Sequence, residues 1–376
     1  MYLDYAATSP MRQVAIDAWT EHAHFLNPAG QYALGRDARR ALETARETIA
    51  GLLGAEPIEV IFTASGTEAD NMAILGLNAR TEAASLPIIA SPIEHPAVRE
   101  SLTQVAGTTI EYLKTDASRV LIDATLDAPA RFATLMWANN ETGAIQPVEE
   151  FVARASAVGT PTHIDAVQVV GHLPVNFDAL GASTLAASAH KFGGPRGFGF
   201  LLAKRTAPLA PIFHGGGQER RLRPGTVDVA GAAAAAAALE ESVAQAEQEN
   251  ARIAALRDKL RAGIEATVPN ILIHTPPADS ELGALPGHLY VSFCGAEGDS
   301  LIMLFDTKGI ACSTGSACSS GVNRASEVLI AQGVSEKDAR SAIRFSLGRE
   351  NTEAEIDELL AFIPEAVERA RLAGMA

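Results

Sequence analysis

Cysteine is scarce in this sequence, with three in 376 residues. Three thiols in a chain of this length cannot form a disulfide framework, so we expect a reducing compartment. Long hydrophobic runs are also missing, because no stretch approaches the ~20 consecutive apolar residues of a membrane-spanning helix. The first residues, 1–5, lack the basic region and apolar core of an export signal. We therefore expect a cytoplasmic protein without a membrane partner.

Positive charge is under-represented as well. Lys and Arg number 30 against 45 Asp and Glu, which gives a formal net charge of −15. Nucleic-acid backbones are bound by clustered Lys and Arg, so this balance argues against a nucleic-acid partner. The densest basic stretch, 220–223, is short and predicts a local anion-binding or interface patch.

The first two thirds of the chain alternate between short β-rich runs and amphipathic helical stretches. This pattern predicts an α/β domain with a parallel or mixed sheet and helices on both faces. The predicted strands are 60–63, 87–90, 132–136, 163–165 and 184–186. Ligands bind at the carboxyl ends of strands in such sheets.

Seven alanines at 232–238 open a long helical stretch that continues to about residue 260. After Pro276 and Pro277 the pattern changes to short strands (289–293, 343–346) and helices (299–305, 353–370). This change predicts a smaller α+β domain. We place the large domain at 10–255 and the small domain at 1–9 together with 256–376.

Lys191 follows the last predicted strand of the large domain and precedes a Phe-Gly-Gly-Pro turn. A lysine that forms a Schiff base with an aldehyde must be partly desolvated and held by rigid backbone, as this position allows. The alternative is a solvated strand end, which is common for lysine.

Two further strand ends carry groups that such a lysine would need. The segment 63–70 (TASGTEAD) opens a helix, where backbone amides and the Thr67 hydroxyl could bind a phosphate; alternatively it is only a well-capped helix, since Ser65 and Glu68 have capping-box spacing. Asp165 ends another strand and could hold the proton of a pyridine nitrogen, or cap the next helix.

Other polar residues follow the remaining strands. His95 could stack on an aromatic ring or move a proton, although a loop histidine is often only a surface residue. Asn139 and Asn140 could donate hydrogen bonds to a cofactor oxygen, or form an ordinary turn.

The three cysteines differ in their surroundings. Cys318 lies in a stretch of small residues, 313–321, without an apolar pattern to bury it, and such a thiol is predicted to be nucleophilic or redox-active. Cys294 is interpreted as a packed strand residue and Cys312 as a strand-end residue, both buried and inert. Cys312 and Cys318 fit no common zinc spacing, so we expect no metal site.

Motifs along the whole chain combine into one pattern. They include NNETG at 139–143, HIDAVQ at 163–168, SAHKFGG at 188–194, RPGT at 223–226 and GSAC at 315–318. With them the chain resembles the cysteine desulfurases of the iron–sulfur assembly and nitrogen-fixation type. These are pyridoxal-phosphate enzymes of the class-V aminotransferase family.

The resemblance implies a homodimer of fold-type I, with a mainly parallel large domain that binds pyridoxal 5′-phosphate and a small domain that carries the catalytic cysteine. Lys191 would bind the cofactor covalently, His95 would stack on its ring and Cys318 would accept sulfur. The implied cofactor-binding residues are Gly66, Thr67, Asn140, Asp165, Gln168, Ser188, His190 and, from the partner subunit, Thr226. Arg344, helped by Asn27, would bind the substrate carboxylate.

The implied reaction converts L-cysteine to L-alanine and leaves a persulfide on Cys318 for a sulfur acceptor such as an iron–sulfur scaffold or sulfur carrier. Three alternatives stay open. A selenocysteine lyase or cysteine-sulfinate enzyme shares the cofactor site. An aminotransferase would not need the cysteine segment, and a sulfur-carrying interaction protein would not use the cofactor.

Overall fold

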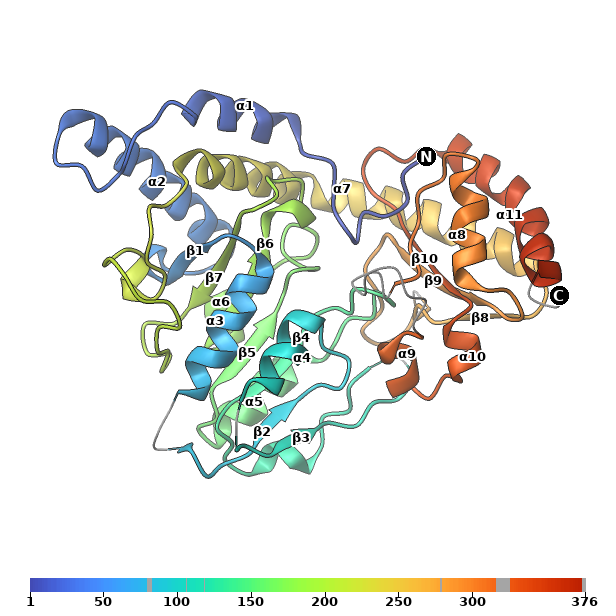
Figure 1. Cartoon of the computed structure of the whole chain (residues 1–376), viewed down its shortest axis with the longest axis horizontal. Helices are drawn as coiled ribbons and strands as arrows, with labels where there is room; N and C mark the ends of the chain where they lie inside the picture. The colour runs from blue at the N-terminus through green and yellow to red at the C-terminus, as the bar shows by residue number, and fades with distance from the viewer. Residues whose placement is uncertain (80–82, 106, 118, 278, 316–324, 374–376) are drawn as a thin grey trace.

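The computed structural model describes residues 1–79, 83–105, 107–117, 119–277, 279–315 and 325–373. It contains two sheets, each with its own apolar core, joined by one long helix (Figure 1). Its helices are α1 (Gln13–His22), α2 (Ala33–Leu52), α3 (Gly66–Asn78), α4 (Pro96–Thr103), α5 (Val148–Ala157), α6 (Phe177–Leu180), α7 (Val229–Thr267), α8 (Gly298–Asp306), α9 (Glu327–Ala331), α10 (Glu336–Ala339) and α11 (Glu353–Ala373). Within the described ranges, no helix combines the length and apolar character needed to cross a lipid bilayer.

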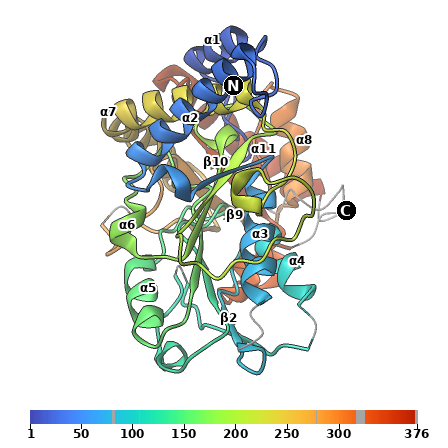
Figure 2. The same cartoon turned by 90° about the vertical axis from the view of Figure 1, so that its left-hand side faces the viewer.

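Seven strands form the large sheet, in the order β1-β7-β6-β5-β4-β2-β3. They are β1 (Val60–Thr63), β2 (Ile88–Ala90), β3 (Ile110–Tyr112), β4 (Ala133–Met136), β5 (Thr162–Asp165), β6 (Thr184–Ser188) and β7 (Gly199–Ala203). Strand β7 pairs antiparallel with β1 and β6, and the other pairs in this sheet are parallel. Helices α3 and α4 cover one face, and α2, α5 and the first part of α7 cover the other (Figure 2). The predicted α/β class with a mainly parallel large sheet is confirmed.

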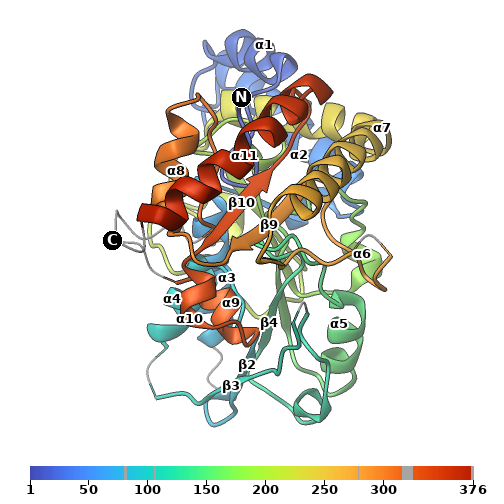
Figure 3. The ribbon, with the colours of Figure 1, turned by 90° about the vertical axis from the view of Figure 1, so that its right-hand side faces the viewer.

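The small sheet is antiparallel, in the order β10-β9-β8. Its strands are β8 (Ile271–Ile273), β9 (His288–Phe293) and β10 (Ala342–Ser346). Helices α8 and α11 pack on it in Figure 3, and the core beneath them also contains Leu3 from the start of the chain. The predicted smaller α+β domain is therefore present.

Helix α7 belongs to both domains. Its 39 residues span about 58 Å at 1.5 Å per residue. Residues up to Leu239 pack in the core of the large sheet, whereas Ile253 to Ile264 pack in the core of the small sheet. The domain boundary predicted at residue 255 falls inside this helix, so no loop marks it.

The first twelve residues connect the small sheet to the large one. Tyr5 N donates to Ser346 O of β10 (3.1 Å), and Ser9 N donates to His190 O (2.9 Å), just after β6. Residues 189–191 form a short 3-10 turn, η4. The start of the chain therefore lies against the turn that carries Lys191.

Candidate active site

A cavity of about 340 Å³ opens at the carboxyl ends of β4, β5 and β6, between the two domains. Ten of the predicted site residues line it: Gly66, Thr67, His95, Asn140, Asp165, Gln168, Ser188, His190, Lys191 and Arg344. Asp70, Met136 and Gly315 also line it. The structure thus gathers in one place predicted site residues as far apart in the sequence as Gly66 and Arg344.

Lys191 lies in η4, directly after β6. Its Nζ donates to the carbonyl oxygens of Ala6 (2.5 Å) and Ala7 (3.0 Å). The position at the mouth of the strand was predicted. The two carbonyl oxygens were not, because they come from the start of the chain.

Asp165 ends β5 and is buried. Burial, followed by the nearby carboxyl of Asp70, raises the pKa of Asp165 to about 7. Its Oδ1 accepts from Val167 N (2.9 Å), so the helix-cap interpretation also describes part of its role. A buried acid at this place fits a protonated ring nitrogen, whose charge would favour the ionised carboxylate.

A second acid lies behind Asp165 and was not predicted. Asp70 of α3 is buried, its pKa is raised well above the ordinary value by burial, and its Oδ1 lies 3.2 Å from His163 Nε2. His163 Nδ1 lies 3.0 Å from Thr184 Oγ1, and burial lowers the pKa of His163 to about 4. Side chains alternate between the two faces of a strand, so His163 and Asp165, two residues apart on β5, point to the same face. The sequence could have shown this.

His95 caps α4 rather than lying on the surface. Its Nδ1 accepts from Ala97 N (3.1 Å), so a neutral His95 ring carries its proton on Nε2. Burial, followed by the charges of Lys191, Arg99 and Arg344, lowers the pKa of His95 to about 4. The ring is therefore uncharged at neutral pH, which suits a stacking role.

The start of α3 forms the opposite end of the cavity. Ser65 Oγ accepts from Glu68 N (3.1 Å), as the capping-box spacing predicts, but Glu68 Oε2 accepts from Ala64 N (2.8 Å) instead of from Ser65 N. A side chain at Gly66 would lie 2.7 Å from Val167 Cγ2, so only glycine lets the helix start approach β5 this closely. Helix starts with exposed amides bind phosphate well.

Arg344 of β10 forms the third side of the cavity. It is buried, donates from Nη1 to Asn140 O (2.7 Å) and pairs through Nη2 with Asp4 Oδ1 (2.7 Å). Its Nε is buried without a hydrogen-bond partner among the described residues. A donor of this kind can bind a carboxylate.

These residues fit pyridoxal 5′-phosphate. The helix start with Thr67 and Ser188 suits the phosphate, the buried acid Asp165 suits the ring nitrogen, and Lys191 lines the same cavity. Asp70, His95 and Asp165, which line the same cavity, also place one potential metal-ligand atom each within 4.8 Å of one another.

Comparisons with known proteins agree with this geometry. The sequence model of aminotransferase class V matches residues 1–359. The chain belongs to the class-V aminotransferase family. An IscS-like cysteine desulfurase of Mycobacterium tuberculosis is 43% identical over 100% of this chain and 98% of that relative.

Two solved structures are similar over most of this chain. A NifS-like protein is 33% identical with a TM-score of 0.88, over 98% of this chain and 99% of its own. A structure of SspA in complex with cysteine is 29% identical with a TM-score of 0.79, and the match covers 93% of this chain and 99% of that one. The predicted family is confirmed.

Two predicted site residues of this class-V chain lie elsewhere. Asn27 and Thr226 line a second cavity of about 470 Å³, and neither lines the Lys191 cavity. Asn27 Oδ1 accepts from Ala29 N (2.9 Å). Within one chain the structure therefore separates these two residues from the other ten, and their roles stay predictions.

The second cavity contains strained backbone. Glu219, Arg220 and Arg221 have φ values of 45°, 57° and 64°, a left-handed conformation that costs about 1 kcal/mol or more per residue outside glycine. Glu219 stabilises it, because its carboxylate pairs with Arg46 Nη2 (2.7 Å) and accepts from Phe62 N (2.8 Å). This is the segment in which a basic interface or anion patch was predicted.

Cys318 lies outside the described residues. The other two cysteines are partly buried, and burial raises the pKa of the Cys312 thiol strongly. A thiol that stays protonated is a poor nucleophile, in agreement with the packed role predicted for Cys312.

Proposed function

We propose that this protein is a pyridoxal-phosphate-dependent cysteine desulfurase. It converts L-cysteine to L-alanine and transfers the sulfur to Cys318, from which a sulfur acceptor such as an iron–sulfur scaffold or sulfur carrier takes it. The observation that carries the proposal is the cavity that unites Lys191, Asp165 and the unpaired Nε of Arg344. Relatives named cysteine desulfurase support it.

The cofactor end of the cavity offers binding groups for three parts of pyridoxal phosphate. The start of α3 with Thr67, Ser188 and His190 would hold the phosphate, Gln168 and Asn140 would hold the ring oxygen, and Asp165 would hold the ring nitrogen. When bound, pyridoxal phosphate would supply an electron sink that makes the substrate Cα–H acidic. Lys191 would hold the cofactor, and its Nζ would be the group that accepts the Cα proton.

Arg344 orients the substrate. The substrate carboxylate would accept a hydrogen bond from the buried Nε of Arg344, which has no other partner among the described residues. Buried, charge-assisted hydrogen bonds of this kind are strong and directional. The amino acid is thereby held with its Cα toward Lys191.

Sulfur transfer requires a second nucleophile, which we assign to Cys318. Its thiolate attacks the substrate sulfur, so that a sulfur–sulfur bond forms while the carbon–sulfur bond breaks. The electron pair of that bond stays on the carbon, which is then protonated to give alanine. We assign the proton transfer to His95, whose Nε2 carries the proton of the neutral ring.

A homodimer would explain the separated residues. Asn27 and Thr226 line the second cavity. Several large apolar side chains are about half exposed, among them Trp19, Leu26, Tyr32 and Phe213. Exposed apolar side chains of this size indicate an interface. In a dimer, Thr226 of one chain would complete the phosphate site of the other.

The test compares two cysteine variants of the cofactor-loaded protein. With L-cysteine and a reducing agent, Cys318→Ser should lose alanine and sulfide formation but keep the cofactor absorbance. Cys312→Ser, the matched control, should keep all three. Full desulfurase activity in Cys318→Ser would refute the proposal. With L-selenocysteine as the substrate, selenide release by Cys318→Ser would instead favour a selenocysteine lyase.

A further inference from the structure

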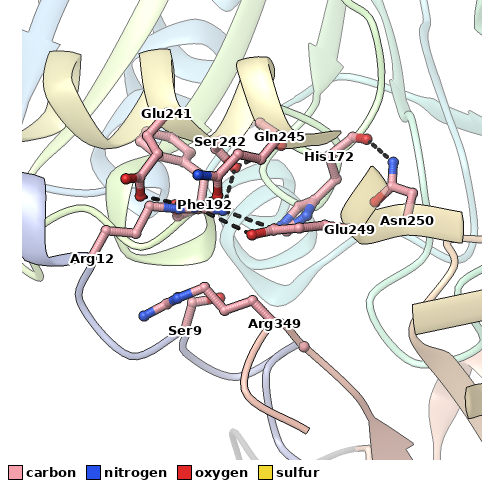
Figure 4. Close-up of polar contacts among 12 residues, drawn as sticks. Ser9, Arg12, His172, Phe192, Glu241, Ser242, Gln245, Glu249, Asn250 and Arg349 are labelled. Atoms are coloured by element: carbon pink, nitrogen blue, oxygen red, sulfur yellow. Dashed lines mark hydrogen bonds and ion pairs between the residues drawn. The ribbon is translucent and has the colours of Figure 1, made fainter. Parts of the chain in front are cut away.

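The N-terminal segment 5–12, which we call the strap, makes several hydrogen bonds to the turn that carries Lys191. Figure 4 shows Ser9 and Arg12 of the strap together with His172. We propose that Ser9 and Arg12 of the strap, together with His172, are positioning residues that fix the backbone of Lys191 for its reaction with the cofactor. The inference rests on the proposed role of Lys191 as the cofactor-binding lysine. It adds three residues that act through Lys191 without lining the cavity themselves.

The carbonyl group of Lys191 receives two hydrogen bonds. Ser9 Oγ donates to Lys191 O at 2.7 Å, and His172 Nε2 lies 3.1 Å from the same oxygen. A carbonyl oxygen has two lone pairs, so both are used. Because the oxygen can only accept, His172 Nε2 must carry a proton, and burial keeps the His172 ring neutral by lowering its pKa.

Strap residues also bind the neighbouring carbonyl groups. Ser9 N donates to His190 O (2.9 Å), Arg12 Nε to Phe192 O (3.1 Å) and Arg12 N to Gly193 O (2.8 Å). Four consecutive carbonyl groups, 190–193, therefore accept from two strap residues. Gly193 has φ +86°, and a side chain there would lie 2.7 Å from Arg12 Cγ.

Arg12 is itself fixed on α7. Its guanidinium group is buried and binds Glu241 (3.0 Å), Glu249 (3.0 Å) and Gln245 (2.9 Å), while Ser242 lies 3.2 Å from Nη2. These four partners occupy successive turns of one helix face. Figure 4 shows the guanidinium between the helix and the Phe192 turn. The strap is therefore held by the rigid helix that joins the two domains.

The same strap receives the lysine side chain. Ala6 O and Ala7 O accept from Lys191 Nζ, so strap residues hold both the backbone and the amine of one lysine. Lysine has a flexible four-carbon stem, and an error of about 1 Å in a reacting group can cost up to ~100-fold in rate. Fixing the backbone limits the positions that the amine can reach.

The test uses substitutions that remove one donor each, because loss of the buried Arg12 could unfold the protein. Ser9→Ala and His172→Phe each leave one donor to Lys191 O. His172→Gln restores a nitrogen near the position of Nε2. Thr160→Val is the matched control, since it removes a buried hydroxyl that accepts from Ala130 N (2.8 Å) far from Lys191.

Cofactor-free protein is mixed with pyridoxal phosphate, and the first-order growth of the visible absorbance is followed. We expect Ser9→Ala and His172→Phe to slow this step, and kcat for L-cysteine, by about tenfold with KM nearly unchanged. His172→Gln should recover most of the rate. Thr160→Val should lower the melting temperature as much as Ser9→Ala does but leave both rates unchanged.

The positioning role would be overturned if Ser9→Ala, His172→Phe and Thr160→Val took up the cofactor at the same rate and had the same kcat. Failure of the proposed function gives a different result. If the unaltered protein takes up pyridoxal phosphate but forms no alanine, the desulfurase proposal is wrong, while the rate of cofactor uptake still tests the strap.

Discussion

The cofactor end of the Lys191 cavity comes from the large domain, whereas the arginine end comes from the small domain and the start of the chain. Asp165, Ser188 and Lys191 follow neighbouring parallel strands, so the sheet itself brings them together. Arg344 lies on β10 of the other sheet and is fixed by Asp4 and Asn140 O. The difference suggests that cofactor binding and substrate binding can be changed separately.

Lys191 lies where the two ends meet, so its loss should have the largest effect. We expect Lys191→Ala to lower kcat by at least ~10³-fold, because both the covalent link and the proton acceptor are lost. Dialysis followed by an absorbance spectrum should show that cofactor is still held non-covalently. An unchanged visible band in this variant would mean that another group forms the link.

The arginine end is tested by Arg344→Gln. We expect KM for L-cysteine to rise about 100-fold, because a charge-assisted hydrogen bond to the carboxylate is lost. The cofactor absorbance should not change. Steady-state kinetics and a spectrum on the same preparation separate the two ends, and loss of cofactor in Arg344→Gln would contradict the separation.

Asp165 gives a prediction about stability at the cofactor end. Its pKa of about 7 lies above the usual 3.8, so the folded protein retains a proton that the unfolded chain has lost between these values. Raising the pH through this window therefore costs folding stability in the cofactor-free protein. Asp165→Asn removes that cost, and its melting temperature should exceed that of the unaltered protein by about 2–4 °C at pH 8.

The gain from Asp165→Asn should shrink as the pH falls toward 4. Asp17→Asn, an exposed change on α1, is the control and should show no such trend. Melting curves of the cofactor-free proteins from pH 5 to pH 8 supply the measurement. A difference that stays constant over this range would show that Asp165 is not the titrating group.

The smallest effect is expected for Asp4→Asn. This change removes the charge beside Arg344 but leaves the guanidinium and its bond to Asn140 O in place. We expect KM to change by less than about threefold, since the Nε that would bind the substrate carboxylate makes no bond to Asp4. A larger rise would mean that Asp4 orients Arg344 for the substrate.

The sequence predicted those features that depend on local pattern. Lys191, Asp165 and Asn140 each follow an apolar run, and strand ends of a parallel sheet meet at one edge. Strand β7 was missed, although its segment Gly199–Ala203 is apolar, because glycines surround it. The pair of Asp70 and His163 was also missed, since 93 residues separate them.

Contacts of the strap could not be predicted for the same reason. Ser9 and Lys191 are 182 positions apart, and no periodicity relates a loop at the start of the chain to a turn after the sixth strand. For Asn27 and Thr226 the situation is reversed. The sequence motifs that contain them were found, but the structure of a single chain does not place them in the Lys191 cavity.

The shared helix α7 has a consequence for how the protein unfolds. Two domains with separate cores would ordinarily melt in two steps, but here one helix supplies Leu239 to the first core and Ile253 to the second. Between them, Gln245 and Glu249 bind Arg12 and leave no break in the helix. Loss of either core therefore removes the support of the other, and calorimetry of the cofactor-free protein should show one cooperative transition.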